Sequence, residues 1–244
     1  NNGYKYNIKK DLIHVIGREA TSGDLLKELA SLAKVSHLDI VGKDLYLYNR
    51  EEGKVWGARN EYFSAPRIDN LECAYTTLLG FLKAKKQNIS LYCVFDNEEV
   101  GSATKQGAGS TFLADVLTRI TIALGLSKEE ELRMLADSFM VSADNAHALH
   151  PNYPEKADTT NRVYLNEGIV IKHNANQKYT TDGVSRGIFK GIMNQAKIKV
   201  QDYANPSDMP GGSTLGNISN TKVSLNTIDI GLPQLAMHSP YESA

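Results

Sequence analysis

The chain has 244 residues, 41% of them hydrophobic and 23% charged, so it can bury a core, and its composition excludes collagen, coiled-coil and fully disordered chains. Lysine and arginine (27) nearly balance aspartate and glutamate (28), which argues against nucleic acid or a membrane as a partner. Cys73 and Cys93 cannot make a disulfide framework, so we expect a reducing, cytoplasmic location.

Residues 1–44 are the least informative part of the chain about the fold. Leucines recur at helical spacing within residues 24–34, which predicts a helix. Residues 45–48 and 54–58 flank an Asn-Arg-Glu-Glu-Gly sequence, which predicts a β-hairpin with Gly53 in the turn.

From residue 65 onward, helical patterns alternate with short apolar runs. Helices are predicted at residues 71–86, 111–124 and 184–198, with a further helix after the capping box of Ser127 and Glu130. Short apolar runs that suit buried strands lie at residues 89–95, 138–142, 168–172 and 223–230. This alternation predicts an α/β fold with a mostly parallel core sheet.

Carboxylate-rich sequence directly follows two of these apolar runs. Glu98 and Glu99 follow the run at 89–95, and Asp144 and His147 follow the run at 138–142. Ligands of open α/β sheets bind beyond the carboxyl ends of the strands, so these side chains are candidates for a site. Adjacent carboxylates are costly there unless a cation or hydrogen bonds compensate them.

Carboxylates with imidazole and no usable thiolate suit a divalent ion such as Zn²⁺, Mn²⁺ or Co²⁺. Two ions about 3.5–4 Å apart can share one carboxylate and activate one water, with a non-ligating carboxylate as general base. Each motif alone also has a common alternative: a Glu-Glu pair is often solvated, a lone histidine is often structural, and Asp69 could cap the helix that follows it.

The motifs taken together are more specific than any one of them. They occur in order from about residue 55 to the end, at residues 65–70 (APRIDN), 96–102 (DNEEVGS), 142–147 (SADNAH), 150–156 (HPNYPEK), 168–172 (GIVIK), 209–216 (MPGGSTLG) and 235–239 (LAMHS). This set resembles the M18 family of zinc aminopeptidases, the aspartyl aminopeptidase family. The resemblance implies a three-layer α/β/α zinc-peptidase-like catalytic domain with a mixed, mostly parallel sheet over residues 55–244. It assigns residues 1–54 to a partial, inserted oligomerisation domain and implies a homo-oligomer, a dodecamer.

The resemblance also implies a role for individual residues. Asp69 would bridge two divalent metal ions, with Glu99 and His238 on one ion and Asp144 on the other. Glu98 would be the general base, taking a proton from a metal-activated water and delivering it to the leaving amine. The ions are expected to be zinc, with manganese and cobalt as alternatives.

Other residues would contact the substrate, a peptide with a free N-terminus whose first residue is removed. The resemblance places His147 and Lys172 near its polar groups, and Lys172 could receive an acidic (Asp or Glu) side chain. The loop at Gly211 and Gly212 would let the backbone approach the substrate. The peptide bond between Asp69 and Asn70 is expected to be cis, which is rare for a non-proline residue.

One departure from the family pattern keeps alternatives open. The family's metal site also takes a histidine from a His-Thr-Asp-type motif, which this sequence lacks, and His14 and His37 lie in other contexts. We expect that ligand to lie in residues before Asn1. The alternatives are a metal-poor peptidase homologue that serves as a structural or binding subunit, and another two-metal aminopeptidase family of different specificity. The retained pair Glu98 and Glu99 favours an enzyme.

Overall fold

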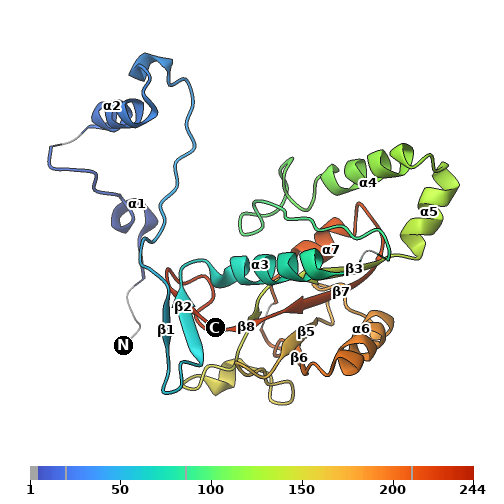
Figure 1. Cartoon of the computed structure of the whole chain (residues 1–244). Coiled ribbons are helices and arrows are strands. Elements are labelled where there is room, and N and C mark those ends of the chain that lie inside the picture. The colour runs from blue at the N-terminus through green and yellow to red at the C-terminus, as the bar shows by residue number, and fades with distance from the viewer. Residues whose placement is uncertain (1–4, 20, 86, 210) are drawn as a thin grey trace. The chain divides into compact units, whose positions relative to one another are not determined.

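The computed structural model describes residues 5–19, 21–85, 87–209 and 211–244, and its contacts divide the chain into two compact units, Asn1–Tyr48 and Asn49–Ala244 (Figure 1). The first unit contains α1 (Ile8–Asp11), α2 (Ser22–Ala33) and the 3₁₀ helix η1 (His37–Asp39). The predicted helix at 24–34 is confirmed as α2, which begins at Ser22 because Thr21 and Asp24 form a capping box.

The predicted hairpin has a different partner strand. Residues 45–48 form no strand, and β1 (Lys54–Trp56) instead pairs antiparallel with β2 (Tyr62–Ala65). The indole of Trp56 fixes this pairing, since it donates to Ser64 Oγ at 2.8 Å and its ring lies 4.9 Å from that of Tyr62. The turn therefore lies after Trp56, not at Gly53.

The central sheet has the strand order β3-β7-β5-β6. Its strands are β3 (Phe139–Ala143), β5 (Ile169–His173), β6 (Val200–Ala204) and β7 (Asn226–Gly231). β3 is parallel to β7 and β5 is parallel to β6, whereas β5 and β7 are antiparallel. This confirms the expected mixed sheet with mostly parallel pairs.

Helices cover both faces of this sheet (Figure 1). On one face, Phe189 of α6 (Gly183–Ala196) packs against Ile171, Ile228 and Ile230. Because side chains alternate along a strand, Asp229 points to the other face, and there α7 (Leu215–Ser219) approaches so closely that a Cβ at its Gly216 would collide with Asp229. The layering is therefore α/β/α, as the family resemblance implies.

Most of the other predicted elements are present. The predicted helices correspond to α3 (Ile68–Lys83), α4 (Phe112–Ala123) and α5 (Lys128–Ala136), the last with the capping box of Ser127 and Glu130. Short elements complete the second unit: β4 (Ala146–His147) pairs with β8 (Pro233–Gln234), β9 (Glu242–Ser243) joins β2, and η2 spans Pro154–Lys156.

The predicted strand at residues 89–95 is wrong. This segment is extended but belongs to no sheet, and its side chains Ile89, Leu91 and Val94 are 65%, 46% and 60% exposed. An apolar run becomes a buried strand only beside another strand, and within the described parts of the chain no strand pairs with it. Within the described residues, every helix is too short or too polar to span a lipid bilayer.

Asp202 on β6 joins the sheet to α6 through a cluster of cations. Its carboxylate accepts from Arg186 at 2.9 and 3.1 Å and from Lys190 at 2.9 Å, and His173 Nε2 lies 3.2 Å away. Burial alone would raise the pKa of Asp202, but these hydrogen bonds outweigh burial and hold that pKa well below its usual range.

We expect Asp202→Asn to lower the free energy of unfolding by about 1–2 kcal/mol, because it removes hydrogen bonds made to charged groups. Since the folded-state pKa is depressed, this contribution is present above the unfolded pKa of about 4 and is lost as pH falls below it. Urea unfolding of both proteins between pH 7 and pH 3 measures the difference. The exposed Glu167, paired with Lys199, provides the control Glu167→Gln, which should change little.

Candidate active site

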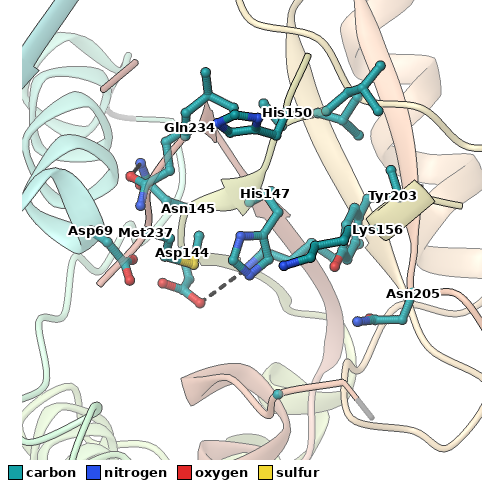
Figure 2. A pocket seen from close by; sticks show the side chains of 18 of the residues that line it. Asp69, Asp144, Asn145, His147, His150, Lys156, Tyr203, Asn205, Gln234 and Met237 are labelled. Atoms are coloured by element: carbon teal, nitrogen blue, oxygen red, sulfur yellow. Dashed lines mark hydrogen bonds and ion pairs between the residues drawn. The ribbon is translucent and has the colours of Figure 1, made fainter. Parts of the chain in front are cut away.

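A cavity of about 500 Å³ opens where several strands and loops of the second unit end. Figure 2 shows Asp69 and Asp144 on one side of this cavity and Lys156, Tyr203 and Asn205 on the other, with His147 between them. The sequence-predicted residues that line it are Asp69, Glu98, Glu99, Asp144, His147, Lys172, Gly212 and His238. Residues far apart in the sequence thus line the same cavity.

Three of these side chains form a compact cluster. His238 Nε2 lies 3.1 Å from Asp69 Oδ2 and 3.2 Å from Glu99 Oε2. One ligand atom from each of the three residues lies within 4.8 Å of the others, so together they could hold a metal ion. The predicted ligands Asp69, Glu99 and His238 are therefore brought together, from three separate segments.

The start of α3 positions Asp69. The bond between Asp69 and Asn70 is cis, which confirms the prediction, and both residues have non-helical backbone angles. The Asn70 side chain donates to Ala143 O at 2.9 Å and accepts from Asn145 N at 3.2 Å, which ties this backbone to the end of β3. The regular helix continues from Leu71, after the non-helical Asp69 and Asn70, so Asp69 stands just before it. Its carboxylate nevertheless makes no capping bond within the described residues, because Oδ1 has no hydrogen-bond partner and Oδ2 faces His238 at 3.1 Å.

Asp144 lies in the same cavity but outside the three-residue cluster. Its Oδ2 pairs with Lys172 Nζ at 3.0 Å. Lys172 is only 3% exposed, and its ammonium also lies 5.4 Å from the centre of the Tyr179 ring. In this structure, the carboxylate expected on the second ion thus has a buried lysine as its counter-ion.

The carboxylates of the cavity repel one another. Burial, together with the charges of Asp144 and Glu99, raises the pKa of Asp69 to about 8. Burial and the same two charges raise the pKa of Glu98 to about 7. Asp69 Oδ1 is buried and has no hydrogen-bond partner within the described ranges. Excess negative charge and an unsatisfied buried oxygen both fit a divalent cation, and carboxylates with imidazole suit zinc.

Glu98 and Glu99 have different surroundings, as expected for successive residues. Glu99 joins Asp69 and His238, whereas Glu98 lines the cavity without joining that group. Two hydrogen bonds close the base of their loop, because Asp96 N donates to Gln106 O at 3.0 Å and Asn97 Nδ2 donates to Thr104 Oγ1 at 2.9 Å. The Glu98 carboxylate therefore lies outside the cluster and faces the cavity.

Only some of the residues predicted to bind substrate line the cavity. His147, Lys172 and Gly212 line the cavity, but Gly211 does not. A Cβ at Gly211 would collide with Asn174, so this glycine is packed against a neighbouring loop.

Sequence reasoning missed several cavity residues. The rings of Tyr179 and Tyr203 line the cavity, but their segments carry no residue pattern that marks a site. Another omission is the buried Glu242 behind the cluster, and its four-residue spacing from His238 is the only signal in the sequence.

Comparisons with known proteins agree on one family. The model of the family described as "Aminopeptidase I zinc metalloprotease (M18)" matches residues 5–244. The chain is 44% identical to a "Probable M18 family aminopeptidase 2" of Clostridium novyi, over 98% of this chain and 56% of that protein. It is 37% identical to a "Probable aspartyl aminopeptidase" of Ricinus communis, over 88% of this chain and 45% of that protein.

A solved structure gives the same result. The mApe1 dodecamer of S. cerevisiae superposes with a TM-score of 0.76 and 27% identity, covering 91% of this chain and 50% of that one. The chain thus spans about half the length of the curated relatives it matches.

We expect His238→Ala to weaken zinc binding by more than about 100-fold, because loss of a direct ligand costs more than the 10- to 100-fold typical of outer-shell residues. Competition with a chromophoric chelator measures this affinity. The control is His37→Ala, an exposed histidine of the first unit. Equal zinc affinity in His238→Ala and the unmodified protein would show that His238 is not a ligand.

Proposed function

Because the chain belongs to the M18 family of zinc metallopeptidases, we propose that the protein is an aminopeptidase that removes N-terminal residues from peptides. The observation that carries the proposal is the group of ligand atoms from Asp69, Glu99 and His238, which lie within 4.8 Å of one another in a cavity that Glu98 also lines. A scaffold protein has little physical use for the pair Glu98 and Glu99 in one cavity, since burying carboxylates together is costly.

We propose that Asp69, Glu99 and His238 would hold one divalent ion. Asp69 and Asp144 would hold a second ion, so Asp69 would be a ligand of both. Zinc is expected, with manganese and cobalt as alternatives. When bound, such ions polarise a carbonyl group and lower the pKa of a water molecule. Asp144 Oδ2 is paired with the Lys172 ammonium at 3.0 Å, so a bound ion would either use Asp144 Oδ1 or displace that ammonium from Oδ2.

Glu98 is proposed as the general base. Burial, the largest cause, raises the pKa of Glu98 above that of a free glutamate, which suits a group that accepts a proton from the attacking water and gives it to the leaving amine. A carboxylate that binds the metal would be less available to accept a proton. Glu98 lies outside the group of Asp69, Glu99 and His238, and this position supports its role as the general base.

Lys172 and His147 are proposed to bind the side chain of an acidic first residue. Lys172 is a buried cation in the cavity wall, and His147 lines the same wall. A relative named aspartyl aminopeptidase is consistent with this preference. We further propose that the whole protein forms a homo-oligomer, since a solved relative is described as a dodecamer.

A metal-poor homologue with a binding role is the alternative. The ion pair of Asp144 with Lys172 favours it. Metal content separates the two: fewer than one ion per purified full-length chain, together with no peptidase activity, would establish the alternative.

Glu98→Gln should keep its zinc but lose about 100- to 10,000-fold in kcat, because it removes the base and spares the ligands. Metal analysis and steady-state hydrolysis of a peptide give the two quantities. Glu155→Gln, at an exposed glutamate outside the cavity, is the control. Full activity in Glu98→Gln would exclude Glu98 as the base.

Lys172→Met should raise KM for peptides with an N-terminal aspartate by about 10-fold or more and change that for N-terminal leucine much less, since a buried hydrogen bond to a charge is lost. Lys199→Met, at an exposed lysine, is the control. An equal effect on both peptides would contradict a specificity role for Lys172.

A further inference from the structure

Glu242 lies behind the ligand cluster and connects two of its members through their backbones. Its side chain is buried, with the residue 2% exposed. Its Oε2 accepts from the backbone N–H of Asp69 at 2.8 Å, and its Oε1 accepts from the backbone N–H of His238 at 2.6 Å. These are the residues whose side chains meet at 3.1 Å, so one carboxylate holds both main chains.

Both backbone segments need such support. His238 has a φ of 65°, a region that non-glycine residues seldom occupy and that persists only where the surroundings fix it. Asp69 lies in the irregular first turn of α3, where N–H groups have no helical partner. The Glu242 carboxylate satisfies one N–H in each segment.

Glu242 is itself held in place by the small sheet. It lies on β9, where it pairs with Ala65 of β2, four residues before Asp69. β9 therefore holds the Glu242 carboxylate beside the start of α3. The short turn between His238 and β9 holds the same carboxylate beside the backbone of His238. Ala65 lies four positions before Asp69, and His238 lies four positions before Glu242. These short connections restrict the distance between the Asp69 and His238 backbones.

We propose that Glu242 is a positioning residue that sets the Asp69–His238 geometry for metal binding. This inference rests on the proposed metal function. The carboxylate is required because it offers two acceptor oxygens at once, whereas a glutamine has one and would turn its NH₂ group toward a second N–H donor. A shorter aspartate would not reach both N–H groups. Glu242 thus acts through two proposed ligands without touching the metal.

The test compares Glu242→Gln with Glu167→Gln, which changes an exposed glutamate in the same way. In the full-length protein, we expect Glu242→Gln to bind zinc 10- to 100-fold more weakly, the effect typical of outer-shell residues, and Glu167→Gln to match the unmodified protein. The visible spectrum of the cobalt-loaded, folded Glu242→Gln variant should also change. A merely structural role would lower stability and leave that spectrum unaltered.

The outcomes separate this inference from the proposed function. No zinc binding by the unmodified protein would overturn the proposed function. Normal zinc affinity and an unchanged cobalt spectrum in Glu242→Gln would overturn the inference alone.

A second measurement applies if Glu242→Gln does not fold. In the unmodified protein, the amides of Asp69 and His238 should exchange hydrogen slowly, and more slowly still with zinc, because both hydrogen bonds must open first. Exchange of both amides as fast as exposed loop amides, with and without zinc, would also overturn the inference.

Discussion

Repulsion among carboxylates governs the second unit of this protein. Asp69, Glu99 and Asp144 face one cavity, and burial together with their mutual charges raises the pKa of Asp69 to about 8. Such a site is stable only if cations or donors surround it. The structure supplies part of this compensation, from the imidazole of His238 and the ammonium of Lys172, and leaves Asp69 Oδ1 without a partner within the described residues.

The mixed sheet makes this convergence possible. β3 and β7 run parallel, so the segments that follow them, with Asp144 and His238, leave the sheet at the same edge. β5 lies antiparallel to β7. Lys172, near the end of β5, nevertheless lines the same cavity. The irregular start of α3 then adds Asp69, anchored to the end of β3 through Asn70.

The sequence predicts local features well where they depend on neighbouring residues. The capping box of Ser127 and Glu130 marks a helix start, because both partners lie within one turn. By contrast, the strand predicted at 89–95 depended on a neighbour that local sequence does not reveal. The hairpin failed for a related reason, since the contacts of Trp56 with Ser64 decide its pairing.

The candidate site shows the same division. The residue types at Asp69, Glu99 and His238 indicate metal chemistry, but only the fold places atoms 169 positions apart within 3.1 Å. Glu242 was not predicted, because an isolated glutamate belongs to no residue pattern that marks a site. The pair of Asp144 and Lys172 was not predicted either, although both residues were assigned to the site separately.

That pair has a thermodynamic consequence. Asp144 and Lys172 each neutralise the other, so a ligand that displaced one of them from the pair would leave the other uncompensated in a largely buried place. If Lys172 and Asp144 bind as proposed, an anion on Lys172 would weaken its hold on Asp144, and a cation on Asp144 would weaken its hold on Lys172. The two binding events would then be reciprocally coupled, and each ligand would increase the affinity of the protein for the other.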